Sequence, residues 1–279
     1  MEKYSVLMSL YKKEKPDYLW QSIDSILKQT VKPDEIVIVK DGLITSELEE
    51  VLFKFQNEYP GLFNIVESKK NLGLGLALNL GLKKCRNNLV ARMDTDDISL
   101  PDRCEKQLQA FEQDKELTIV GTMVAEFADD NPNMIVSSRV LPTKHEEIYE
   151  FGKKRSPFNH PTVMYKKDKV LSVGGYSDLR RNQDVDLFGR MLHAGYKATN
   201  INEALLLFRI NKNLLKRRRS WENTKSYIAA VRNLWKLGYS SFIDYVIVII
   251  AQMIIFFCPI KIQSWIYKKF LRDQVQISV

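Results

Sequence analysis

Cysteine is scarce in this sequence: the 279 residues contain three, Cys85, Cys104 and Cys258. No two of them form a CxxC pair and none has a histidine at ligand spacing, which excludes a disulfide scaffold and a zinc site of the usual spacing. We therefore expect free thiols in a reducing compartment. A secretory leader is not expected either, because the apolar stretch in the opening residues, MEKYSVLMSL, is too short for one.

Acidic residues are rare in the last quarter of the chain. Residues 207–279 contain 13 lysines and arginines against 3 acidic residues, whereas residues 1–206 contain 29 against 31. The net charge of +8 is thus the sum of +10 in the last quarter and −2 in the rest. A tail that is both basic and apolar indicates an anionic membrane surface as partner, and no nucleic acid.

The apolar run near the C-terminus is too short for a clean membrane span. Tyr245–Cys258 would reach about 21 Å as a helix, against a hydrocarbon core of about 30 Å. Beyond it, an apolar stripe among basic residues predicts a helix that lies on anionic lipid; the stripe consists of Ile262, Trp265, Ile266 and Phe270. The alternative is a pair of helices packed on the rest of the chain or on a second copy.

The first two-thirds of the chain alternates short apolar runs with helical patterns, which predicts an α/β fold with a largely parallel sheet. The predicted strands are Ser5–Leu10, Glu35–Lys40, Leu62–Val66, Asn88–Met93, Leu117–Phe127 and Met134–Val140. Helices are predicted from Pro16, over Ser46–Tyr59, and from an N-cap at Ser99 to about Phe111. Asn71–Leu82 fits both a strand and a helix, and its interleaved glycines favour the helix.

Three carboxylates follow the strand that ends at Met93, in Asp94-x-Asp96-Asp97. Ligands bind at the carboxyl edge of an open α/β sheet, and carboxylates this close repel one another unless a cation lies between them. Hard oxygen ligands suit Mg²⁺ or Mn²⁺. An acidic solvated turn before a helix is the alternative.

Two further acidic positions are candidates. Asp41 ends a strand, where it serves either as an acceptor for a ligand or as the first residue of an Asp-Gly turn. Asp184 and Asp186 open a helix, where acidic residues stabilise the helix dipole. At that position a carboxylate that faces a cleft can also act as a general base.

Together these segments resemble glycosyltransferase family 2, in particular the branch that builds bacterial capsule and exopolysaccharide repeat units. The resemblance covers roughly residues 4–210. Its motifs are Ser5–Tyr11, Ser25–Thr30, Pro33–Gly42, Asn71–Leu74 with Asn79-x-Gly81, Arg92–Asp97, Gly174-Gly175-Tyr176 and Gln183-Asp184.

The resemblance implies a GT-A fold, a Rossmann-like sheet flanked by helices, with a nucleotide-binding half at residues 1–97 and an acceptor-binding half at 98–215. Residues 216–279 would form a helical, membrane-associating appendage. Asn71–Leu82 becomes a loop followed by a helix. The residues implied to contact the nucleotide sugar are Ser9, Tyr11, Asp41, Asn71, Gly73, Arg92, Asp94 and Arg209.

The resemblance also implies an inverting reaction that depends on Mn²⁺ or Mg²⁺. Asp94 and Asp96 would bind the metal, and Asp184 matches the catalytic base. The sequence departs from the family pattern at Gln183, where a glutamate usually precedes the base, and at Asn211, where a histidine is usual. Asn211 would still offer the metal an oxygen, as a weaker ligand.

The expected partners are a UDP-sugar donor, a lipid-linked saccharide acceptor and the cytoplasmic face of the inner membrane, to which the protein would bind peripherally or as a monotopic protein. A homodimer through the C-terminal helices stays open. Two other functions also stay open: a sugar nucleotidyltransferase, and a non-catalytic membrane-attached protein that binds sugar nucleotides.

Overall fold

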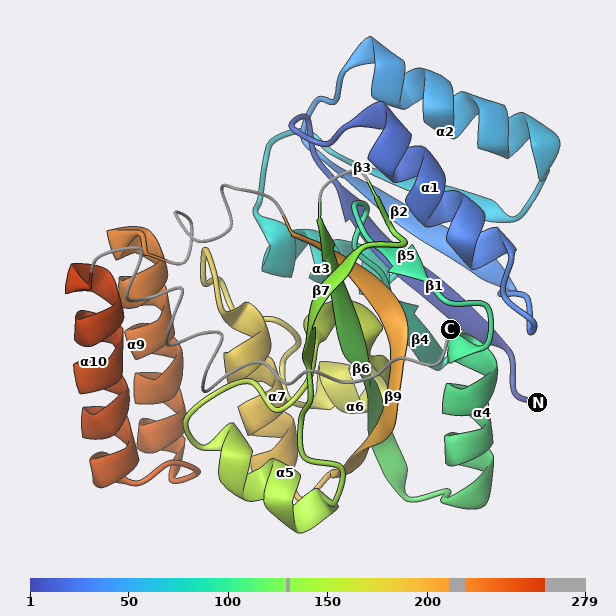
Figure 1. Ribbon diagram of the computed structural model, residues 1–279. Coiled ribbons are helices and arrows are strands. Elements are labelled where there is room, and N and C mark those ends of the chain that lie inside the picture. Colours follow the sequence, from blue (N-terminus) through green and yellow to red (C-terminus); the bar gives the residue numbers. More distant parts are fainter. Residues whose placement is uncertain (129–130, 211–218, 259–279) are drawn as a thin grey trace.

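A nine-stranded mixed sheet runs through the molecule, and helices cover both of its faces (Figure 1). The computed structural model describes residues 1–128, 131–210 and 219–258. The strands are β1 (Tyr4–Leu10), β2 (Glu35–Asp41), β3 (Phe63–Ser68), β4 (Leu89–Arg92), β5 (Ile98–Ser99), β6 (Leu117–Ala128), β7 (Ile135–Arg139), β8 (Met164–Lys166) and β9 (Lys197–Ile210). The helices are α1 (Pro16–Leu27), α2 (Ser46–Glu58), α3 (Leu74–Leu82), α4 (Arg103–Gln113), α5 (His145–Gly152), the 3₁₀ turn η1 (His160–Thr162), α6 (Lys167–Ser172), α7 (Gln183–His193), α9 (Trp221–Leu237) and α10 (Phe242–Phe257).

The strand order is β3-β2-β1-β4-β8-β6-β9-β5, with β7 paired to β6. The four neighbouring strands β3, β2, β1 and β4 are parallel to one another, as predicted. In the second half only β6 and β9 are parallel, and the other pairings are antiparallel. The sheet is therefore mixed, with a parallel first half and a mostly antiparallel second half.

The central strands are buried on both faces, which explains their continuous apolar runs. In β1, Val6 and Met8 pack with helices α1, α2 and α4, whereas Leu7 packs with α3 and α7 on the opposite face. The two apolar clusters of the core thus lie on either side of one sheet.

The Asn71–Leu82 segment is a loop followed by helix α3, as predicted. Gly81 allows the close approach of this helix to the sheet, since a Cβ there would come within 2.5 Å of the Leu7 and Val39 side chains. The prediction that Ser99 caps a helix is wrong. Ser99 lies in β5 and α4 begins after Asp102, because Gln29 and Ser25 hold Ser99 with side-chain hydrogen bonds.

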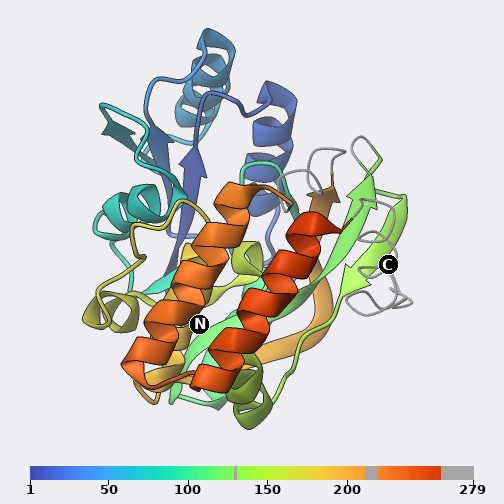
Figure 2. The same ribbon diagram turned by 90° about the vertical axis from the view of Figure 1, so that its left-hand side faces the viewer.

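Helices α9 and α10 form an antiparallel pair on the side of the molecule that faces the viewer in Figure 2. Ala230, Val231 and Leu234 of α9 belong to the same buried cluster as α7. Helix α10 begins with a capping box between Ser241 and Asp244 and packs on α9. Among the described residues, no helix combines the length and the apolar character needed to cross a bilayer. The stripe predicted over Ile262–Phe270 lies outside these residues.

Candidate active site

The carboxylates of Asp94, Asp96 and Asp97 form a cluster at the carboxyl end of β4, with their oxygens within 4.8 Å of one another. Burial raises the pKa of Asp97 well above its usual value, and the charges of Asp96 and Asp94 raise it further. The Oδ2 atom of Asp97 is buried and has no hydrogen-bond partner in the described part of the chain. Clustered hard oxygens with one unsatisfied atom fit a divalent cation such as Mg²⁺ or Mn²⁺.

Hydrogen bonds from distant elements hold this acidic loop in place. Ser22 of α1 donates its hydroxyl proton to the Asp94 main-chain oxygen at 2.7 Å. Thr95 donates to Glu14, in the loop before α1, at 2.6 Å. Helix α1 and the segment before it thus hold the acidic loop.

Arg209 was predicted to contact the donor, and the structure places it against the acidic loop. Its guanidinium lies between the rings of Tyr18 and Phe127, with centroid distances of 3.8 and 4.6 Å. Its Nε donates to the Asp96 main-chain oxygen at 2.8 Å, and its backbone N–H donates to Asp97 at 2.9 Å. Arg209 therefore holds the acidic loop through two hydrogen bonds, and its contact with the donor stays a prediction. Asn211, the third predicted metal ligand, lies outside the described residues.

Arg92 is fully buried behind the acidic cluster. Its Nη2 lies 2.5 Å from Asp94 Oδ1, and its Nε and Nη1 have no hydrogen-bond partner in residues 1–128, 131–210 and 219–258. The ion pair holds one oxygen of Asp94, whose side chain stays 31% exposed. Like Arg209, Arg92 is a buried arginine that contacts the acidic loop.

Asp41 fixes the loop between β3 and α3. Its carboxylate accepts hydrogen bonds from the backbone N–H of Leu72 at 2.6 Å, from that of Gly73 at 3.0 Å and from the Asn71 side chain at 2.9 Å. Gly73 has φ +88°, which a residue with a side chain adopts only with strain. Three of the predicted donor contacts, Asp41, Asn71 and Gly73, therefore form one structural unit at the carboxyl edge of β2.

We expect Asp41→Asn to lower the free energy of unfolding by about 1–3 kcal/mol, because the new amide places a donor opposite bound N–H groups. Urea unfolding of the variant beside Asp17→Asn, an exposed aspartate in α1, measures the difference. Equal stability of the two variants would contradict this role for Asp41.

Ser9 and Tyr11 lie at the same edge of the sheet. Ser9 pairs with Val39 in the register of β1 and β2, and Leu7 pairs with Arg92 in β4. Ser9 is consequently level with the start of the acidic loop. Tyr11, just beyond the strand, is 40% exposed. The register thus brings both residues to the edge where Asp41 and the acidic loop lie.

Asp94 and Asp184 line one cavity of about 190 Å³. Asp184 lies in the first turn of α7, after Asn182, which adopts a left-handed conformation with φ 56°. Burial raises the pKa of the Asp184 carboxyl, while backbone hydrogen bonds and the Arg139 guanidinium lower it. A carboxylate whose pKa is raised is a stronger base for a hydroxyl proton.

Asp186, the other acidic residue of this helix, does not line the cavity. It is buried and forms an ion pair with Arg190, with Oδ2 at 2.8 Å from Nη2. Arg190 in turn donates to the main-chain oxygen of Gly175 at 2.6 Å. Asp186 therefore fixes the Gly174-Gly175-Tyr176 turn against α7, and its role is structural.

His160 lines the same cavity, and its Nε2 lies 2.9 Å from the Tyr176 hydroxyl. Burial and the nearby Arg92 charge lower the pKa of His160 well below its usual value, so the ring is neutral at pH 7. Asn79 of α3 holds the Tyr176 backbone with hydrogen bonds of 2.7 and 2.8 Å. The predicted Asn79 and Gly-Gly-Tyr motifs thus meet beside the cavity.

The sequence did not point to several residues that line this cavity. They are Val124 and Glu126 of β6, Arg139 of β7, and Phe158, Asn159, Pro161 and Phe208. Glu126 could have been identified from the sequence as a candidate site residue, because it is a charged residue within the otherwise apolar run of β6. The pairing of β6 with β7 places Val124 and Arg139 side by side, and Phe208 belongs to β9. Phe158, Asn159 and Pro161 belong to the segment at η1.

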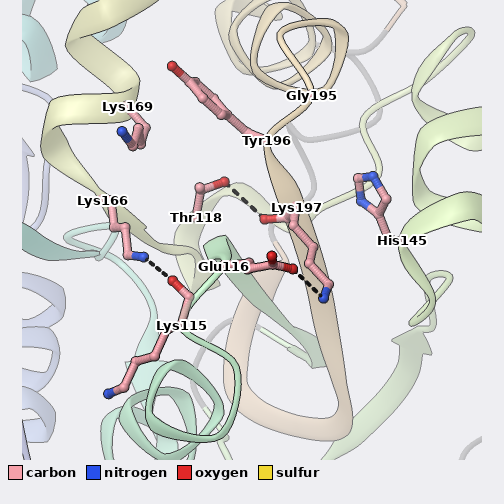
Figure 3. A pocket seen from close by; sticks show the side chains of 9 residues that line it. All are labelled: Lys115, Glu116, Thr118, His145, Lys166, Lys169, Gly195, Tyr196 and Lys197. Carbon is pink, nitrogen blue, oxygen red and sulfur yellow. Dashed lines mark hydrogen bonds and ion pairs between the residues drawn. The ribbon is translucent and has the colours of Figure 1, made fainter.

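A second hollow, of about 520 Å³, lies where β6 and β9 begin (Figure 3). In Figure 3 the Lys197 side chain is directed toward Glu116, and that of Lys166 toward the Lys115 main-chain oxygen. Lys197 also pairs with Asp114. This hollow contains none of the predicted site residues.

Comparison with known proteins identifies the family. Residues 5–174 match the family Glycosyl transferase family 2. The chain is 37% identical over 266 residues to an amylovoran biosynthesis glycosyltransferase, AmsE, of Erwinia amylovora, covering 95% of this chain and 98% of that protein. It is 36% identical over 272 residues to an Escherichia coli UDP-Gal:alpha-D-GlcNAc-diphosphoundecaprenol beta-1,3-galactosyltransferase, covering 97% of both chains.

Solved structures share the fold at low sequence identity. A mannosyltransferase of Pyrobaculum calidifontis in complex with GDP-Man and Mn²⁺ has a TM-score of 0.61 at 12% identity, covering 95% of this chain and 83% of that one. GalNAc-T7 with UDP, GalNAc and Mn²⁺ has a TM-score of 0.64 at 14% identity, covering 83% of this chain and 48% of that one. The mixed α/β, GT-A-like fold is confirmed. The chain belongs to glycosyl transferase family 2 and is a glycosyltransferase.

Proposed function

We propose that this enzyme transfers a hexose or N-acetylhexosamine from a UDP-sugar to a lipid-linked saccharide, with inversion at the anomeric carbon, in the biosynthesis of a surface polysaccharide. The observation that carries the proposal is the single cavity shared by Asp94, of the acidic cluster, and Asp184, at the start of α7. The names of the two relatives, one for amylovoran and one for a diphosphoundecaprenol-linked acceptor, support the substrate classes.

Asp94 and Asp96 would hold a Mn²⁺ or Mg²⁺ ion, with Asn211 as a third oxygen ligand. The clustered acids and the Mn²⁺ named with both structural neighbours support this assignment. When bound, the ion neutralises the negative charge that develops on the departing diphosphate. Ser9, Tyr11, Asp41, Asn71 and Gly73 lie along the sheet edge that would bind the nucleotide, and Arg92 and Arg209 support the acids from behind.

Asp184 would take the proton of the acceptor hydroxyl as its oxygen attacks the anomeric carbon. The bond from that carbon to the diphosphate breaks on the opposite face of the ring, so one displacement inverts the configuration. The raised pKa of Asp184 suits this role, because a more basic carboxylate accepts the alcohol proton more readily. Gln183, in place of the usual glutamate, removes a neighbouring charge that would raise this pKa further.

Incubation of the full chain with a panel of UDP-sugars, Mn²⁺ and a membrane lipid extract tests the proposal. We expect one sugar donor to release UDP and to label a lipid-extractable saccharide. Release of pyrophosphate would instead indicate a sugar nucleotidyltransferase, and binding of UDP without turnover would indicate a non-catalytic binding protein.

We further propose that α10 attaches the enzyme to the cytoplasmic face of the inner membrane as a peripheral or monotopic protein. One side of α10 exposes a continuous apolar stripe: Ile243, Ile247, Ile250, Ile254 and Phe257. Spacings of three and four residues put these side chains on one face of the helix. The net charge of +10 over residues 207–279 complements an anionic lipid surface.

The double substitution Ile250→Ser and Ile254→Ser should weaken binding to anionic lipid vesicles about tenfold or more, because it removes two large apolar side chains from the lipid contact. Sedimentation with vesicles measures the loss. Leu43→Ser with Phe53→Ser, which changes two exposed apolar residues elsewhere, is the matched control. A variant that loses a dimer but keeps its vesicle binding would contradict the lipid assignment and favour a homodimer through these helices.

A further inference from the structure

The cavity at the proposed active site contains several negative charges and one arginine. Ten described residues line it, and three of them are carboxylates: Asp94, Glu126 and Asp184. Arg139 is the arginine among these ten, and His160 is neutral at pH 7. In such surroundings the buried Asp184 carboxyl holds its proton more readily unless a positive charge lies close by.

The β6–β7 hairpin directs Arg139 into this cavity. Arg139 is the register partner of Val124, so the two side chains share one face of the hairpin. Val124 and Glu126, two residues apart in β6, line the cavity from that same face. The position of Arg139 therefore follows from strand pairing.

Ser156 connects Arg139 to the base. The Arg139 Nη2 donates to the Ser156 main-chain oxygen at 3.3 Å, and Ser156 is buried. The Ser156 side chain and the Arg139 charge both stabilise the ionised form of Asp184 and lower its pKa against the effect of burial. The positive charge of Arg139 therefore acts on the Asp184 carboxylate, although the two residues are 45 positions apart in the sequence.

We propose that Arg139 is a positioning residue that holds the Asp184 carboxylate in its charged form inside the cavity. This inference rests on the proposed function, in which Asp184 accepts the acceptor proton. The titratable and charged side chains around Asp184 are Arg139 of β7, Tyr176 of the turn before α7 and, across the cavity, Glu126, His160 and Asp94. Arg92, whose charge also acts on Tyr176 and His160, forms its ion pair with Asp94. Arg139 is the arginine whose charge lowers the pKa of Asp184.

The test is the dependence of kcat/KM on pH for the full chain, with Mn²⁺ saturating at each pH. The rate rises with pH as Asp184 loses its proton, so the midpoint of the acid limb follows the pKa of the base. Without Arg139 that pKa rises, because a nearby opposite charge lowers a carboxyl pKa by about 1–3 units. We expect Arg139→Gln to move the acid limb upward by about 1 unit or more, with the rate recovering toward that of the unaltered enzyme at high pH.

Arg139→Lys retains the charge and should keep the acid limb close to its original position, which also provides the test if the glutamine variant does not fold. Arg155→Gln, which removes an exposed guanidinium, should leave the limb unchanged. Three results would overturn the inference. Arg139→Gln could lose activity equally at every pH, or it could raise the KM for the acceptor while the acid limb stays in place. Arg139→Lys could shift the acid limb as much as Arg139→Gln does. Turnover by Asp184→Asn would instead contradict the assignment of the base itself, so the two failures are distinguishable.

Discussion

Asp184→Asn should reduce sugar transfer by about 10²–10⁴-fold, the usual contribution of a general base. The amide has nearly the shape of the carboxylate but cannot accept the proton of the acceptor hydroxyl. Binding of the UDP-sugar should change little, because the acids that would bind the metal and the diphosphate belong to the loop after β4, whereas Asp184 belongs to α7. Initial rates of UDP release, with donor affinity measured by calorimetry, separate the two effects.

Asp178→Asn is the matched control for this experiment. Asp178 is exposed in the turn before α7, six residues ahead of the proposed base, and it does not line the cavity. Its variant should transfer sugar at the original rate. Substantial turnover by the Asp184 variant, at a rate close to that of the control, would remove Asp184 from the mechanism.

Asp96→Ala should lower kcat/KM by about a hundredfold or more, since a Lewis acid at a phosphoryl oxygen is worth several kcal/mol. The cause would be loss of a metal ligand, so UDP affinity should also stop responding to added Mn²⁺. Titration of UDP into the variant with and without Mn²⁺ tests this directly and does not depend on turnover.

Removal of Asp96 also relieves repulsion within the cluster, where its charge raises the pKa of buried Asp97. The folded protein should therefore be no less stable than before, and its unfolding in urea is the check. Asp102→Asn, which changes a half-buried acid before α4, should retain the full response to Mn²⁺. If Asp96→Ala keeps that response as well, the metal is bound elsewhere.

Both predictions depend on features that were recognisable before the structure was known. The acidic cluster was visible because its members lie within four residues of each other and directly follow an apolar strand. Asp184 was identified through resemblance, since an acidic residue at the start of a helix has an ordinary structural role as well. Its neighbour Asp186 has that kind of role and is bound to Arg190.

The contacts of Arg92 and Arg209, the two arginines predicted to contact the donor, could not be predicted from the sequence. Arg209 and Tyr18 are far apart in the chain, yet the ring of Tyr18 lies 3.8 Å from the Arg209 guanidinium. No pattern of neighbouring residues predicts that contact, nor the hydrogen bonds by which Arg209 holds the acidic loop. Arg92 is likewise buried behind Asp94 because β4 is a central strand, covered on both faces.

Periodicity and neighbouring residues were enough to predict the parallel half of the sheet, the acidic loop and the apolar character of the segment that forms α10. The helix within Asn71–Leu82 also needed the resemblance, because the spacing of its leucines fits a strand as well. That Asp94, Asp184 and Arg139 line one cavity, and that one side of α10 is exposed, became visible in the folded chain alone. Strand register and helix packing join residues across long stretches of chain, and the order of residues in a sequence does not specify either.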